Sequence, residues 1–223
     1  MLSFFGRETF SKATAPLGKA LVKTGLTPDA VTVIGTVASI VAAVTLFPTG
    51  HLFWGTMVIW LFVMFDMLDG AMARARGGGT KYGAVLDATC DRVADGAIFA
   101  GLAWWAVYHE NSKPLFVVTL VVLVTSQVIS YAKARAEASG LSADGGLIER
   151  PDRLIIVLVG AGLTGIGGYL GLEWLTLAVY VAMWILAVLS IVTVFQRLLA
   201  VRNSPGARDV IPPRPAAESQ ETA

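Results

Sequence analysis

The sequence predicts an all-α, polytopic membrane protein with six transmembrane helices and an N-terminal amphipathic helix at the membrane interface. Hydrophobic residues make up 55% of the 223 residues and charged residues only 15%, with a mean hydropathy of +0.68. An ordinary soluble domain is far less apolar. Six apolar runs reach the length, roughly 18 residues or more, that a spanning helix needs. With six spans, every lysine and arginine except Lys113 falls on one side, and that bias marks the cytoplasmic side.

The six expected spans are divided by short connections that contain glycine, proline and charged residues. They cover residues 30–47, 52–75, 82–108, 115–136, 154–172 and 174–199. We expect them to form one membrane domain over residues 26–202, with both termini in the cytoplasm. The single cysteine, Cys90, cannot form an internal disulfide.

The two ends of the chain differ from the spans in composition. In residues 1–25, Phe10, Ala13 and Leu17 recur at helical spacing and basic residues lie between them. This pattern is typical of a helix that lies in the cytoplasmic membrane interface. Residues 203–223 contain proline, serine and glutamate but few apolar residues. We expect this cytoplasmic tail to be disordered.

Four aspartates form two pairs on consecutive spans. Asp66 and Asp69 are three residues apart, and Asp87 and Asp91 are four apart, so each pair lies on one face of its helix. The glycines at 77–79 allow the chain to reverse between the pairs. Antiparallel helices would then gather the four carboxylates in the cytoplasmic half of the membrane, where a bound cation would relieve their repulsion. Oxygen ligands suit one or two ions of Mg²⁺, with Mn²⁺ as the alternative.

A structural, transport or scaffold role for the four acids fits the sequence less well than catalysis. The acids would be structural if neighbouring helices neutralised them, but Arg74 and Arg92 are too few for four carboxylates. A cation or proton transporter would need polar residues that continue toward the outer side, and a catalytically silent scaffold would tolerate loss of the acids. A shallow site favours chemistry on a lipid headgroup, with a metal at a diphosphate and a carboxylate as the general base. Asp95 lies one turn deeper, and we interpret it as a hydrogen-bond partner of a neighbouring helix rather than a ligand.

The spacing of these residues carries a family resemblance. The chain reads Asp66-x2-Asp69-Gly70-x2-Ala73-Arg74-x8-Gly83-x3-Asp87-x3-Asp91. This pattern resembles the signature of the CDP-alcohol phosphatidyltransferase family without a departure, and the six-span layout extends the likeness over most of the chain except its C-terminal tail. Within the family, Lys133, Arg135 and the string ERPDR at 149–153 make it most similar to the actinobacterial phosphatidylinositol phosphate synthases.

The resemblance implies an activity, a compartment and an assembly. The chain would be a homodimeric enzyme of the bacterial cell membrane, with its active site on the cytoplasmic side. It would transfer the phosphatidyl group of CDP-diacylglycerol directly to a hydroxyl of inositol phosphate and release CMP. The alternative acceptors in the family are glycerol 3-phosphate, free inositol and serine. We expect no nucleic-acid partner.

The resemblance also assigns roles to residues. The aspartates 66, 69, 87 and 91 would be the metal ligands, and Asp91 would also be the general base. The residues expected to bind CDP-diacylglycerol are Asp29, Thr32, Asp69, Gly70, Arg74, Thr80 and Gly83.

A phosphorylated acceptor needs cations on the metal's side of the membrane. Lys133, Arg135, Arg153 and Arg197 all fall at the cytoplasmic ends of the last three spans, and arginine offers a planar fork to phosphate. We expect these residues to bind the inositol phosphate. The alternative is that they only set the topology or bind anionic lipids.

Overall fold

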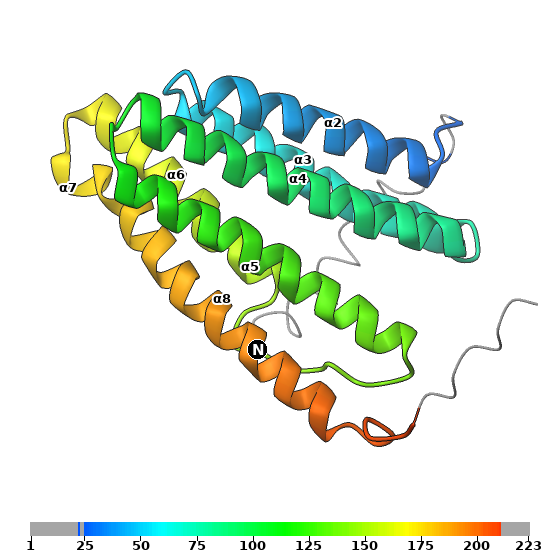
Figure 1. The fold of residues 1–223 in the computed structure, drawn as a ribbon. Coiled ribbons are helices and arrows are strands. Elements are labelled where there is room, and N and C mark those ends of the chain that lie inside the picture. The colour runs from blue at the N-terminus through cyan, green and yellow to red at the C-terminus, as the bar shows by residue number, and fades with distance from the viewer. Residues whose placement is uncertain (1–21, 23–24, 211–223) are drawn as a thin grey trace, which may run out of the picture.

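The computed structural model describes Val22 and residues 25–210 of the chain. Within that part the secondary structure is helical throughout, without a strand. The helices are α2 (Pro28–Leu46), α3 (Leu52–Ala75), α4 (Lys81–Tyr108), α5 (Lys113–Ala138), α6 (Arg150–Leu170), the short α7 (Glu173–Thr176) and α8 (Ala178–Asn203). The long helices run side by side as a bundle (Figure 1). The predicted all-helical fold is confirmed.

The six long helices coincide with the six predicted spans. Five stretches of the described chain are long and apolar enough to cross a membrane, namely α2, α3, α5, α6 and the stretch from α7 through α8. The protein is therefore a membrane protein. Helix α4 is not among these five, because Asp91, Arg92 and Asp95 interrupt its apolar sequence. Its passage through the membrane, and the side that faces the cytoplasm, stay predictions.

Two helix boundaries differ from the predicted spans. Helix α6 begins a turn before residue 154, because the Glu149 and Asp152 side chains form a capping box. The last predicted span is broken near Leu177 into α7 and α8. There the Thr164 hydroxyl donates to the Thr176 carbonyl at 3.3 Å and accepts from the Val179 amide at 3.0 Å, so α6 supplies the partners that the interrupted helix lacks.

The structure describes only part of the two ends of the chain. The predicted interfacial helix at 1–25 lies almost entirely outside the described residues. Of the predicted disordered tail, residues 211–223 lie outside them, while α8 ends at Asn203 and residues 205–208 form turns.

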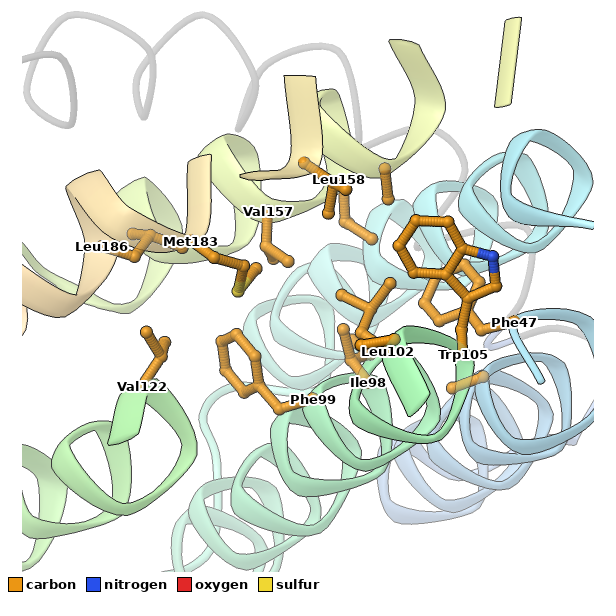
Figure 2. Close-up of a cluster of buried hydrophobic side chains, with 14 of the residues drawn as sticks. Phe47, Ile98, Phe99, Leu102, Trp105, Val122, Val157, Leu158, Met183 and Leu186 are labelled. Atoms are coloured by element: carbon orange, nitrogen blue, oxygen red, sulfur yellow. The ribbon is translucent and has the colours of Figure 1, made fainter. Parts of the chain in front are cut away.

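A buried apolar core holds the bundle together at the end near α7. Phe99 and Trp105 of α4 meet Leu158 of α6, Met183 of α8 and Phe47 at the end of α2 there (Figure 2). Small residues let the helices approach closely. A Cβ at position 101 of α4 would lie only 2.3 Å from the Ala43 carbonyl oxygen, so a larger residue would force α4 away from α2. Toward the opposite end the helices spread apart (Figure 1).

Candidate active site

The two acid-bearing helices, α3 and α4, are joined by a tight turn and share α2 as a packing partner. Each packs closely against α2 and much less against the other. Asp66 and Asp69 are within α3, but their side chains lie outside the described part of the structure. Among the side chains that are described, no three metal-ligating groups are gathered at one point. The convergence of all four carboxylates on one ion therefore stays a prediction.

A pocket of about 360 Å³ opens where α2, α3 and α4 come together. It contains five residues that the sequence analysis assigned to the nucleotide, together with Asp87. Those five are Asp29, Thr32, Gly70, Thr80 and Gly83. We call this cavity the donor pocket.

Helix N-termini and glycines shape the donor pocket. The Thr27 hydroxyl accepts from the Ala30 amide at 3.1 Å, and the Thr80 hydroxyl accepts from the Gly83 amide at 2.9 Å. These caps fix the starts of α2 and α4. A Cβ at position 83 would stand 3.1 Å from both Asp29 Oδ1 and Thr80 Oγ1. The absence of a side chain there is what lets Asp29 approach α4.

The basic residues near the donor pocket differ from the expectation. Arg74 is exposed and does not line the pocket, although its Nη1 lies 3.4 Å from where a Cβ of Gly70 would be. Arg76 does line it, and its Nη2 donates to the Leu26 carbonyl at 2.8 Å. Sequence reasoning missed Arg76. Its position at the C-cap of α3 was the available signal, because basic residues are favoured there.

A second and larger pocket, of about 850 Å³, lies between α4, α5, α6 and α8. Asp91 lines one side, and Lys133, Arg153 and Arg197 line the others. We call this cavity the acceptor pocket. Arg135 does not line it and is exposed on α5.

Two arginines in the acceptor pocket are deeply buried and incompletely bonded. Arg153 is 2% exposed and Arg197 is 6% exposed. Arg197 Nη1 donates to the Ile129 carbonyl at 3.0 Å. Within the described residues, however, Nε of Arg197 and both Nε and Nη1 of Arg153 have no hydrogen-bond partner. Buried donors without partners are costly, so these N–H groups indicate an anion site.

The loop before α6 is held in place by α8. Gln196 Oε1 accepts from the Leu147 amide at 2.9 Å, and the Thr193 hydroxyl accepts from the Ile148 amide at 3.3 Å. Gly146 has φ +123°, and a Cβ there would lie 2.7 Å from Thr193 Cγ2. Only glycine suits both the backbone and the space. The loop therefore delivers the first turn of α6, with Arg153, to the pocket.

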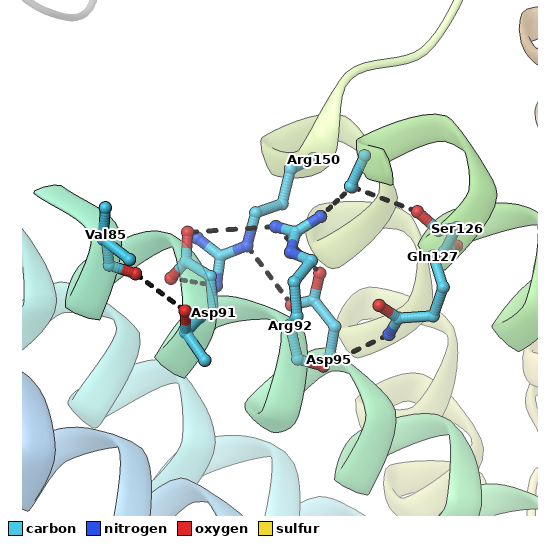
Figure 3. Close-up of polar contacts among 9 residues, drawn as sticks. Val85, Asp91, Arg92, Asp95, Ser126, Gln127 and Arg150 are labelled. Carbon is cyan, nitrogen blue, oxygen red and sulfur yellow. Dashed lines mark hydrogen bonds and ion pairs between the residues drawn. The ribbon is translucent and has the colours of Figure 1, made fainter. Parts of the chain in front are cut away.

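The acids of α4 meet a third arginine, Arg150, which the sequence analysis assigned to no site. Arg150 Nη2 lies 2.8 Å from Asp91 Oδ1, and Arg150 Nε lies 3.3 Å from Asp95 Oδ1 (Figure 3). Arg92 Nη2 is 3.5 Å from Asp95 Oδ2. Asp95 is thus bonded to a residue of another helix, as we interpreted it. The sequence did offer a signal for Arg150. It lies three residues before Arg153, and therefore on the same face of the helix.

Helix α4 lies between the two pockets and contributes an acid to each. Asp87 lines the donor pocket, and Asp91, one turn later, lines the acceptor pocket. The metal-ligating atoms that the structure describes at this boundary are carboxylate oxygens, which suit a hard divalent cation. A group bound in one pocket would therefore meet a group bound in the other at this acid pair.

Comparison with known proteins gives consistent results. The sequence profile described as CDP-alcohol phosphatidyltransferase matches residues 25–192. A phosphatidylinositol phosphate synthase of Mycobacteroides abscessus is 66% identical over 212 residues, which cover 95% of this chain and 94% of that protein. One of Corynebacterium glutamicum is 48% identical over 210 residues, covering 94% of this chain and 93% of its own.

Solved structures agree with these matches. The Mycobacterium tuberculosis phosphatidylinositol phosphate synthase with CDP-DAG bound superposes with a TM-score of 0.84 at 57% identity, covering 91% of this chain and 100% of that one. The same enzyme in complex with manganese and citrate gives a TM-score of 0.83 at 58% identity, covering 89% and 93%.

Proposed function

The chain belongs to the CDP-alcohol phosphatidyltransferase family, and on that premise we propose that it makes phosphatidylinositol phosphate. It would transfer the phosphatidyl group of CDP-diacylglycerol to a hydroxyl of inositol phosphate, with CMP as the second product. The names of its relatives and the CDP-DAG bound to the M. tuberculosis enzyme support this reaction.

One observation carries the proposal, namely two unlike pockets that meet at the acid pair of α4. The donor pocket offers glycine backbone and threonine hydroxyls beside Asp87, which suits a flat nucleotide and its diphosphate. The acceptor pocket offers buried N–H groups without partners beside Asp91, which suits a phosphorylated polyol. A transfer between two substrates needs this arrangement, because proximity and orientation supply much of the rate.

The residues of α4 and α3 would hold a divalent cation. Asp87 and Asp91, with Asp66 and Asp69, would form an all-carboxylate ligand set that fits Mg²⁺ or Mn²⁺, and manganese is bound in the relative's structure. When bound, one or two ions would neutralise the diphosphate and the departing CMP.

The protein's own groups would orient the substrates and move one proton. A hydroxyl oxygen of the acceptor attacks the phosphorus that bears diacylglycerol, and the bond from that phosphorus to the CMP oxygen breaks. Asp91 takes the hydroxyl proton as general base. Arg153 and Arg197 hold the acceptor phosphate, with Lys133 at the pocket wall.

Several finer expectations belong to the same proposal. Arg74 would reach the diphosphate from beside Gly70. Arg135, which does not line the acceptor pocket, would bind the phosphates of anionic lipids. Both pockets would open to the cytoplasm, because the basic residues lie at that end of the helices. The enzyme would be a homodimer, as the family resemblance implies.

A substrate screen tests the reaction. The purified full-length protein in detergent is incubated with CDP-diacylglycerol, Mg²⁺ and one radiolabelled acceptor at a time, and CMP release is measured. We expect release with inositol phosphate, none with free inositol or serine, and inhibition by a chelator that added Mn²⁺ reverses. CMP release with glycerol 3-phosphate instead would identify that compound as the acceptor. Activity that survives the chelator would contradict the requirement for a metal ion.

A further inference from the structure

Among the acids near the two pockets whose side chains the structure describes, Asp95 is the most deeply buried, and the proposed reaction assigns it no role. It is 2% exposed and lies one turn beyond Asp91 on α4. Burying a charge is costly unless it is paired and hydrogen-bonded. Asp95 meets that requirement with two arginines, since Oδ1 faces Arg150 at 3.3 Å and Oδ2 faces Arg92 at 3.5 Å.

The first of these arginines connects Asp95 to α6. Arg150 is the first residue of that helix, and its guanidinium contacts Asp91 through Nη2 and Asp95 through Nε (Figure 3). Arg153 follows three residues later and therefore lies on the same face. Whatever fixes Arg150 against α4 also fixes the direction in which Arg153 enters the acceptor pocket.

The second arginine connects Asp95 to α5. Arg92 Nη1 donates to the Ser130 hydroxyl, and the Arg92 carbonyl accepts from Gln127 Nε2 at 3.2 Å. Lys133 lies three residues after Ser130, on the same face of α5. Three walls of the acceptor pocket thus meet through the two oxygens of one buried carboxylate.

Helix packing alone does not account for such a cluster. Buried ion pairs add little net stability, because desolvation offsets much of the attraction, and in some proteins they fix one arrangement of the elements that they join. Large side chains of the apolar core such as Trp105 lie more than two helical turns from Asp95, and the core reaches the charged cluster through Ile148 and Leu154. The charged cluster lies where the helices spread apart and where a defined separation between Asp91 and Arg153 matters for a substrate held by both.

We propose that Asp95 is a positioning residue for the acceptor: by holding Arg150 and Arg92, it sets the distance from the phosphate-binding Arg153 to Asp91. This inference rests on the proposed function, in that Arg153 binds the phosphate of the acceptor. Asp95 itself touches neither substrate. Its loss should weaken acceptor binding and leave the donor pocket, which it does not line, unaffected.

The test compares Asp95→Asn, Arg150→Gln and the double variant with the wild-type protein, all full-length and in detergent. Binding of inositol phosphate is measured by titration calorimetry without donor, and the KM of each substrate is measured from CMP release. We expect each single variant to raise the acceptor Kd and KM at least fivefold and to leave the donor KM within twofold. The double variant should be no more than twofold worse than the worse single, since both act through one linkage.

Glu110→Gln is the matched control. This carboxylate also contacts another helix, because it accepts from the Tyr180 hydroxyl of α8 at 3.2 Å, but it lies just beyond the C-terminus of α4, far along the chain from Asp95. Its acceptor Kd should equal that of the wild type. If Asp95→Asn does not fold, Arg150→Gln decides, since Arg150 is partly exposed.

Three results would overturn the inference. They are an unchanged acceptor Kd in Arg150→Gln, a parallel rise of donor and acceptor KM, and single effects that multiply in the double variant. The activity of the wild-type protein tests the proposed function. The ratio of the acceptor Kd and KM in a variant to those in the wild type tests the inference. If glycerol 3-phosphate proves to be the acceptor, the same ratios are measured with it. If no phosphorylated acceptor is turned over, inorganic phosphate is the probe.

Discussion

The two pockets on either side of α4 are built on different principles. The donor pocket is made of glycines, capping hydroxyls and helix starts, so its shape is set by the backbone. The acceptor pocket combines apolar lining with charged side chains from four helices, and ion pairs from Arg150 to the acids of α4 hold α6 against α4. Under the proposed function, most of the nucleotide's pocket comes from one short stretch, residues 70–87, and the start of α2 completes it. Discrimination among small phosphorylated acceptors needs residues that are distant in the sequence.

The largest expected effect comes from the acid that is proposed to act as the general base. Asp91→Asn should lower kcat by about 10²- to 10⁴-fold, because the amide cannot accept the hydroxyl proton. CMP release in the full-length protein measures this loss, and thermal unfolding in detergent checks the fold. An Asp91→Asn variant that folds and retains more than a tenth of wild-type activity would remove Asp91 as the base.

The acceptor side alone should respond to loss of a buried arginine. Arg153→Ala removes a guanidinium that lines the acceptor pocket and whose Nε and Nη1 have no hydrogen-bond partner among the described residues. The acceptor KM should rise at least tenfold, or about 1.4 kcal/mol, and the donor KM should not change. Steady-state kinetics with each substrate varied in turn separate the two constants. Arg202→Ala, at the exposed end of α8, is the control with equal loss of charge. If Arg153→Ala changed the donor KM more than the acceptor KM, the division into two pockets would be contradicted.

The donor side alone should respond to one added methyl group. In Gly83→Ala the new Cβ would be 3.1 Å from Asp29 Oδ1 and from Thr80 Oγ1, so Asp29 or the Thr80 cap must move. The donor KM should rise about fivefold, close to 1 kcal/mol, while the acceptor KM stays the same. Gly168→Ala is the matched control, because nothing lies within 4 Å of a Cβ there. Equal donor KM values in both variants would show that the close approach of Asp29 is unimportant.

Much of the fold could be predicted because it depends on local pattern. The apolar runs and the motif from Asp66 to Asp91 indicated the helical membrane fold and the family, and both are confirmed. The break at Leu177 could not be predicted, because it depends on the Thr164 hydroxyl of another helix. Arg150 was missed for the same reason, since its two acids lie more than fifty residues away in the sequence.

The smallest expected effect concerns a contact at the edge of the donor pocket. Arg76 Nη2 donates to the Leu26 carbonyl at 2.8 Å, which ties the end of α3 to the segment before α2, where Thr27 and Asp29 begin the pocket wall. Both partners are exposed to solvent, so the bond contributes about 0.5–1 kcal/mol, the lower part of the usual range. Arg76→Ala should therefore raise the donor KM about two- to fivefold and leave the acceptor KM unchanged. Because Arg76 also lines the pocket, Arg76→Gln separates its two roles. If the contact with Leu26 matters, the amide restores most of the donor KM; if the charge acts on the diphosphate, the amide is as poor as alanine, and that defect shrinks in high salt.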